Sequence, residues 1–115
     1  MSAHKPTPPS AHPPIPEQIV FDRSELAIIM TLYGRMVALG EWRDYGMSFL
    51  KDAAVFSIFR RSAEHPVYRV EKRPGLRRRQ GQYAVIAMDG RVLRRSGDLR
   101  SALHVLERKL IRAIG

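Results

Sequence analysis

Arginine is the residue type in this sequence whose number and grouping suggest chemistry. Residues 58–115 contain thirteen Arg and two Lys against five Asp and Glu, whereas residues 1–57 contain five Lys and Arg against six Asp and Glu. The excess positive charge, +9 for the whole chain at pH 7, therefore comes from the second half. A guanidinium group bonds bidentately to phosphate or carboxylate, so this half is suited to binding polyanions. The plainer alternative is a solvated charged surface.

The residues predicted to contact nucleic acid belong to strands and loops of this second half. They are Arg60, Arg61, Arg69, Lys72, Arg73, Arg77, Arg78, Arg79, Arg94 and Arg95. Three of them are adjacent in the segment RPGLRRRQGQ, residues 73–82, which Pro74, Gly75 and Gly81 mark as a surface loop. Adjacent cations repel one another unless an anion lies near them, and phosphate is the anion that such a cluster favours.

Two tyrosines, Tyr68 and Tyr83, lie among these arginines in the sequence. Sheets that bind RNA or single strands combine cations that hold phosphates with rings that stack on bases. The same positions also suit rings that face the core and are only bordered by arginines, so both interpretations stay open. The glycine- and aromatic-rich signature of the RNA-recognition motif is absent from the sequence.

Motifs for catalysis, metal binding and cofactor binding are absent. The sequence has no glycine-rich phosphate loop and no nucleophile elbow, and neither His65 nor His104 has a recognisable nucleophile or metal partner nearby. Without cysteine there is no disulfide, which favours the cytoplasm, and no apolar run is long enough to span a membrane. We therefore expect a non-enzymatic cytoplasmic protein with no cofactor, metal or membrane partner.

The first element that positions these residues is a helix beginning after Asp22. Asp22 and Glu25 have the spacing of a capping box, and apolar residues recur at helical spacing from Leu26 until Gly40 ends the helix. The opposite side of the helix is apolar too, so it is either buried on most sides or offers a second face to a partner. Gly34, inside the helix, predicts that another backbone packs close there.

Five segments with strand-like alternation follow, and then a second helix. The predicted strands are Trp42–Lys51, Val55–Arg61, Pro66–Lys72, Gln82–Met88 and Arg91–Ser96. Asp89-Gly90 is typical of a tight hairpin turn. The second helix begins after Asp98 and has the apolar stripe Leu99, Ala102, Leu103, Leu106 and Leu110.

This order of elements predicts an α+β fold. A helix, a four- or five-stranded antiparallel sheet and a second helix are expected to pack as a two-layer sandwich, with both helices on one face. Residues 1–18 are rich in proline and are predicted to form a disordered leader. Residues 19–115 are predicted to form a single α+β domain.

Several short segments of the sequence resemble a family of alphaproteobacterial proteins that is catalogued only as a domain of unknown function. These segments are LYGRMVA (32–38), GEWRDY (40–45), FLKD (49–52), AVFSIFRR (54–61), YRVEK (68–72) and GQY (81–83). The resemblance covers residues 21–112, approximately. It implies a bacterial cytoplasmic protein and carries no activity, cofactor or functional residue to transfer.

The segment at the junction between the first helix and the first strand is the second candidate surface. Trp42, Arg43 and Tyr45 are predicted to form a protein interface there, because Trp and Arg are frequent interface anchors. The alternative is that Trp42 plugs the end of the core.

Two hypotheses for the function of the protein follow from the sequence. The first is a nucleic-acid-binding protein that uses an arginine-rich sheet face and loop. The second is an accessory protein that binds an acidic protein partner or larger complex through helix one and Trp42. The sequence leaves the oligomeric state open.

Overall fold

A computed structural model describes residues 17–61 and 65–114, with side chains as far as residue 108. The elements in chain order are α1 (Arg23–Ala38), β1 (Asp44–Phe49), β2 (Ala54–Phe59), β3 (Tyr68–Lys72), the short 3₁₀ helix η2 (Pro74–Leu76), β4 (Tyr83–Ala87), β5 (Val92–Ser96) and α2 (Leu99–Ile114). The predicted leader, residues 1–18, lies outside the described residues apart from Glu17 and Gln18, which belong to no helix or strand.

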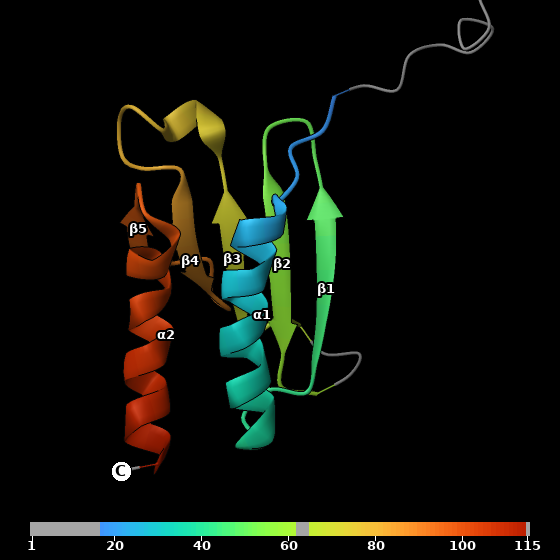
Figure 1. The fold of residues 1–115 in the computed structure, drawn as a ribbon, viewed down its shortest axis with the longest axis vertical. Helices are drawn as coiled ribbons and strands as arrows, with labels where there is room; N and C mark the ends of the chain where they lie inside the picture. Colours follow the sequence, from blue (N-terminus) through green and yellow to red (C-terminus); the bar gives the residue numbers. More distant parts are fainter. Residues whose placement is uncertain (1–16, 62–64, 115) are drawn as a thin grey trace, which may run out of the picture.

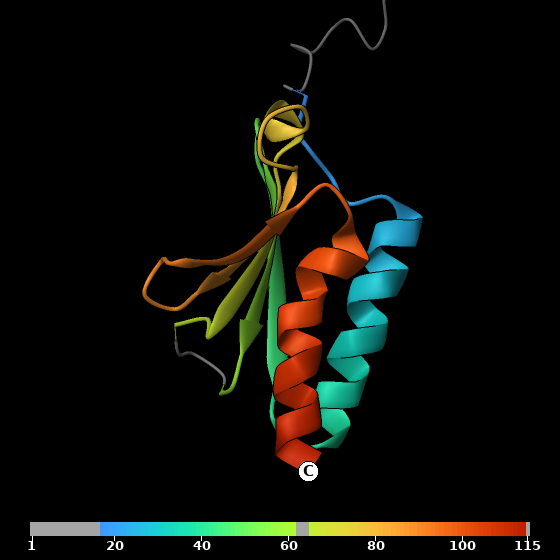
Figure 2. The ribbon, with the colours of Figure 1, turned by 90° about the vertical axis from the view of Figure 1, so that its left-hand side faces the viewer.

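The five strands form one antiparallel sheet in the order β1-β2-β3-β4-β5. Both helices lie on the same face of this sheet, α1 in front of β2 and β3 and α2 in front of β4 and β5 (Figure 1). Figure 2 shows the two layers from the side, with no helix on the opposite face among the described residues. The predicted α+β fold is therefore confirmed, and the sheet has five strands.

The register of the sheet decides which side chains meet the helices. Phe56, Val70 and Val85 lie opposite one another in successive strands, and all three are fully buried in the core. Because side chains alternate along a strand, their neighbours Ser57 and Arg69 point to the face without helices. The alternation that the sequence predicted for the second and third strands is confirmed.

The start of α1 is fixed by the predicted capping box. Asp22 Oδ1 accepts a hydrogen bond from the Glu25 N–H at 2.8 Å, and Glu25 Oε1 accepts one from the Asp22 N–H at 2.7 Å. The helix ends at its C-cap Leu39, and Gly40 follows with a φ of 76°. The prediction for Gly34 is wrong. It lies on the exposed side of the helix, where an added Cβ would meet open space.

Helix α2 buries the side of its surface that the sequence predicted. Leu99, Ala102, Leu103 and Leu106 belong to the core, whereas the side chain of Leu110 lies outside the described residues. Asp98 Oδ2 accepts a hydrogen bond from the Ser101 N–H at 2.9 Å, which is an N-cap bond. Within residues 17–61 and 65–114, neither helix has the length and apolarity needed to cross a membrane.

Candidate nucleic-acid interface

The loop between β3 and β4, residues 73–82, is a compact turn held by its own backbone. The Arg73 N–H donates to the Gln82 carbonyl at 2.6 Å, which closes the base of the loop. The Leu76 carbonyl accepts hydrogen bonds from the N–H groups of Arg79, Gln80 and Gly81 at 3.1, 3.2 and 3.0 Å. The predicted surface loop therefore has a fixed backbone path, because its polar groups bond one another.

Gly81 fixes the end of this loop against the junction of β5 and α2. Its φ of 99° lies in the region that favours glycine, and an added Cβ would lie 2.4 Å from the Ser96 carbonyl carbon. The Gly81 carbonyl also accepts a hydrogen bond from Arg95 Nη1 at 3.4 Å. Only a residue without a side chain fits here. Gly81 is therefore the feature of the sequence that indicates the close approach of the loop to the β5–α2 junction.

The three adjacent arginines of the loop, Arg77, Arg78 and Arg79, are exposed. Within the part of the chain that the structure describes, none of them lies in an ion pair with a carboxylate. Beside them is a depression of about 540 Å³ lined by Ile19, Lys51, Asp52, Arg73, Pro74, Gly75 and Leu76. We call the group of Lys51, Arg73, Arg77, Arg78 and Arg79 the basic end.

On the sheet face without helices, the carboxylate of Glu71 lies between two arginines. Arg69 Nε is 3.5 Å from one carboxylate oxygen, and Arg73 Nε donates to the other at 3.1 Å. Glu71 is only 8% exposed, and the two guanidinium groups beside it offset the cost of burying its carboxylate. The positive charges of Arg69 and Arg73, both predicted to contact nucleic acid, are therefore partly neutralised by Glu71.

Three of the remaining candidates lie away from the basic end. Arg60 and Arg61 follow β2 at the opposite end of the sheet, where a groove of about 530 Å³ lies between them, Arg43 and Trp42. Arg94 lies on the helix-covered face, opposite the buried Val85 in the register, and its Nη2 donates to Ser101 Oγ on α2 at 3.1 Å. A strand of five or six residues spans roughly 17–20 Å. The ten predicted residues therefore do not form one continuous surface.

Lys72 belongs to a partly buried polar network on the helix-covered face. Its Nζ donates to Glu25 Oε1 at 2.8 Å and to the Val20 carbonyl at 3.0 Å. The structure thus places Lys72 on the face opposite Arg69, with its charge paired inside the protein. The sequence contains a signal for this placement. Side chains two residues apart in a strand point to the same face, so Lys72 shares the face of the apolar Val70.

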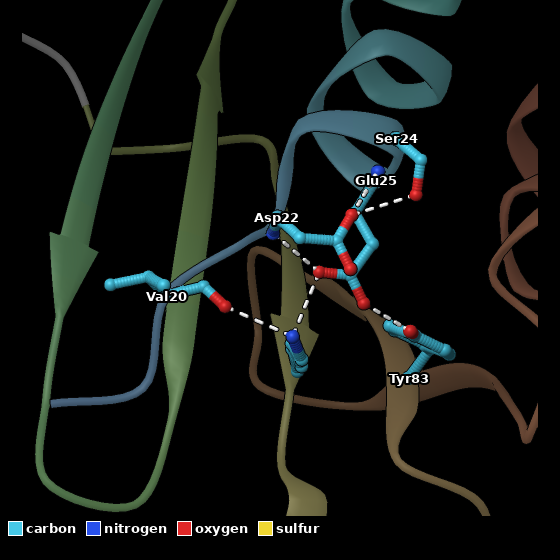
Figure 3. Close-up of polar contacts among 6 residues, drawn as sticks. Val20, Asp22, Ser24, Glu25 and Tyr83 are labelled. Carbon is cyan, nitrogen blue, oxygen red and sulfur yellow. Dashed lines mark hydrogen bonds and ion pairs between the residues drawn. The ribbon is translucent and has the colours of Figure 1, made fainter.

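The same network reaches from α1 to β4. The Tyr83 hydroxyl donates to the second oxygen of Glu25, whose side chain lies between Tyr83 and the start of the helix (Figure 3). Burial raises the pKa of Tyr83, and the hydrogen bond to the Glu25 carboxylate raises that pKa further. Tyr83 is therefore a neutral donor at physiological pH. The Tyr83 ring is 8% exposed and belongs to the core, so it offers no face for stacking on a base, and Tyr68 is also packed against the core.

Trp42 plugs one end of the core. It is 4% exposed, and its ring centroid lies 6.1 Å from that of Tyr33 and 6.3 Å from that of Tyr68. A side chain buried in this way is not free to anchor a partner. The other two residues of the predicted protein interface, Arg43 and Tyr45, are exposed. One side of the Tyr45 ring stacks on Phe56, with centroids 5.0 Å apart.

Comparison with known proteins gives a family and no activity. A family model described as a protein of unknown function (DUF2794) matches residues 19–103. The matched range contains α1, all five strands, the loop 73–82 and the beginning of α2. No curated protein and no solved structure matches the chain.

Proposed function

The chain belongs to the DUF2794 family of proteins of unknown function, and we propose that it is a non-enzymatic protein that binds nucleic acid through the basic end. The observation that carries the proposal is the folded turn of residues 73–82, which holds Arg77, Arg78 and Arg79 as three consecutive exposed residues on a hydrogen-bonded backbone. Their guanidinium groups have no carboxylate partner among the described residues.

A fixed turn suits phosphate binding better than a mobile one. Binding a polyanion orders the side chains and loops that contact it, and a loop already held by backbone hydrogen bonds has less freedom to lose. Each phosphate that an arginine neutralises releases condensed counterions, so affinity gained in this way falls as salt rises. The net charge of +9 adds attraction over distance.

The depression beside the turn favours single-stranded nucleic acid. Ile19, Pro74 and Leu76 contribute apolar surface to it, and Lys51 and Arg73 contribute cations. In a single strand an unpaired base is free to leave its neighbours and lie against such a surface while the phosphates meet the cations. In a duplex the bases stay stacked inside.

The alternative, an acidic protein partner bound through helix one and Trp42, has less support. Its main anchor, Trp42, is part of the core. The acidic protein therefore becomes the expected ligand only if nucleic acid fails to bind.

The experiment is fluorescence anisotropy with labelled single-stranded RNA, single-stranded DNA and duplex DNA at about 50 mM and about 200 mM salt. The wild type is compared with a triple variant, Arg77→Ala, Arg78→Ala and Arg79→Ala. The matched control, Arg43→Ala, Arg60→Ala and Arg61→Ala, removes the same three charges at the opposite end of the sheet.

We expect the loop variant to lose about tenfold or more in affinity for single strands at the lower salt, because three phosphate contacts disappear. The control should lose much less. Equal losses in the two variants would mean that total charge, rather than the turn, binds the strand. No binding of any nucleic acid at the lower salt would overturn the proposal.

A further inference from the structure

The two edge strands of the sheet differ in how they are protected. β5 carries Arg94 and Arg95, and its pairing with β4 has a register shift, both of which discourage a further strand from joining. β1 pairs regularly with β2 over all six residues and has one charged residue, Asp44, at its first position. Nothing in β1 itself therefore prevents another strand from pairing with it.

The outward backbone groups of β1 follow from the hairpin that joins it to β2. The Leu50 N–H donates to the Ala53 carbonyl at 2.8 Å, and hydrogen-bonded pairs alternate along an antiparallel ladder. The N–H and C=O groups of Tyr45, Met47 and Phe49 therefore point away from β2. In agreement, the Tyr45 N–H donates to its neighbour Asp44 Oδ1 at 2.8 Å, and those of Met47 and Phe49 have no backbone partner in the described part of the chain.

Apolar side chains flank this edge on the helix-covered face. Tyr45 and Met47 of β1 are 39% and 40% exposed, and Met30 and Val37 of α1 are 36% and 39% exposed. Met30 and Val37 lie one turn on either side of Tyr33, whose ring meets that of Tyr45 with centroids 5.1 Å apart. Figure 1 shows β1 beyond the outline of α1. We call β1 and these two α1 side chains the β1 edge.

Charge and symmetry identify the occupant of the β1 edge. Two copies of a chain with a net charge of +9 repel each other, so they meet best along a segment without cations, and β1 contains no Lys or Arg and one carboxylate, Asp44. An acidic partner would be drawn to the basic end instead. In an antiparallel pair of β1 strands centred on Met47, Met47 faces Met47 of the second copy and Tyr45 faces Phe49 of the second copy, so apolar residues meet apolar ones.

We propose that two copies of this chain pair through β1 about a two-fold axis at Met47. The pair forms a continuous ten-stranded sheet, in which the outward groups of Met47 and Phe49 bond those of the second copy and the Tyr45 N–H exchanges Asp44 Oδ1 for a carbonyl of the second copy. Both pairs of helices lie on the same face, and the two basic ends lie at opposite ends of the joined sheet. This inference is independent of nucleic-acid binding, because it uses no residue of the basic end.

The first test is sedimentation velocity of the full chain over a range of concentrations. We expect a species of about 26 kDa, twice the 13.1 kDa of one chain. Met47→Lys places two ammonium groups face to face on the axis and should raise the dissociation constant about tenfold or more. The control Met88→Lys adds the same charge at an apolar residue that is 62% exposed on the far hairpin, and should leave the constant unchanged. A chain that stays monomeric, or equal effects of the two variants, would overturn the proposal.

The second test determines the register of the two β1 strands by disulfide formation. The chain has no native cysteine, so only the introduced cysteine can form a disulfide. In the proposed pair the two Met47 Cα atoms lie about 5.5 Å apart, within disulfide range. Those of the next residue, Ser48, are offset along the strands and lie about 8 Å apart, beyond that range. Oxidation with glutathione disulfide should therefore link Met47→Cys chains into dimers and leave Ser48→Cys chains unlinked. Linkage of both variants, or of Ser48→Cys alone, would contradict this register.

Discussion

At the basic end, charged side chains stand on a backbone whose hydrogen bonds are satisfied, whereas at the β1 edge apolar side chains stand beside backbone groups that point outward unpaired. The Leu76 carbonyl accepts three N–H groups of its own loop, but the N–H of Met47 finds no backbone partner among the described residues. The first surface is suited to ligands that bring negative charge, and the second to a partner that brings a strand. Salt should therefore weaken binding at the first surface and not at the second.

The three consecutive arginines of the basic end also differ from the two cations that begin the same part of the chain, Lys72 and Arg73. Lys72 is paired with Glu25 inside the protein and Arg73 bonds Glu71, whereas Arg77 to Arg79 have no ion pair in the described residues. A cation in this part of the sequence is therefore structural or free according to its place in the fold: Lys72 lies in β3 on the helix-covered face, whereas Arg77 to Arg79 lie in the loop. The following predictions test this difference, beginning with the largest expected effect.

Glu25→Ala should reduce the free energy of unfolding by about 3 kcal/mol, because it leaves the Lys72 ammonium and the Tyr83 hydroxyl without their shared partner. Urea denaturation measures the loss. Arg78→Ala is the comparison, and it should change stability by less than about 0.5 kcal/mol because its side chain is exposed. Similar losses of unfolding free energy in the two variants would contradict the view that Lys72 has a structural role and Arg78 does not.

Gly81→Ala should cost about 2 kcal/mol or more, because the new Cβ overlaps the Ser96 backbone at a φ of 99°. It should also weaken single-strand binding although no charge is lost, since the turn can no longer dock. The control Gly90→Ala has a φ of 89° but open space around the Cβ, so it should cost only about 1 kcal/mol and leave binding intact. Unchanged binding by a folded Gly81→Ala protein would show that the fixed turn is not needed.

Tyr83→Phe should cost about 1 kcal/mol near pH 7, through the lost hydrogen bond to Glu25. The pKa of Tyr83 is raised in the folded protein above its ordinary value of 10.0, so the folded state favours the neutral phenol. This contribution is complete below pH 10 and is lost as pH rises above it. Denaturation at increasing alkaline pH should therefore bring the wild type and Tyr83→Phe closer together in stability. A stability difference between the two proteins that widens with pH would contradict the assignment of Tyr83 as a neutral hydrogen-bond donor.

Local patterns in the sequence were enough to predict the elements of the fold. The capping box of Asp22 and Glu25 and the alternation around Val70 depend on neighbours in the chain, and the structure has both. The division of the candidate site could not be predicted in this way. Whether Arg60 and Arg77 lie at one end of the sheet or at opposite ends depends on strand order, and the burial of Trp42 depends on Tyr33 and Tyr68 from other elements.

The most direct test of the central claim is the salt dependence of single-stranded RNA binding, measured as the slope of log affinity against log salt concentration. For a single strand each neutralised phosphate contributes about 0.7 to the steepness of this slope. The variant lacking Arg77, Arg78 and Arg79 should therefore have a slope shallower than the wild type by about 2. The variant lacking Arg43, Arg60 and Arg61 should keep a slope close to that of the wild type. Equal slopes for the two variants would contradict binding through the basic end.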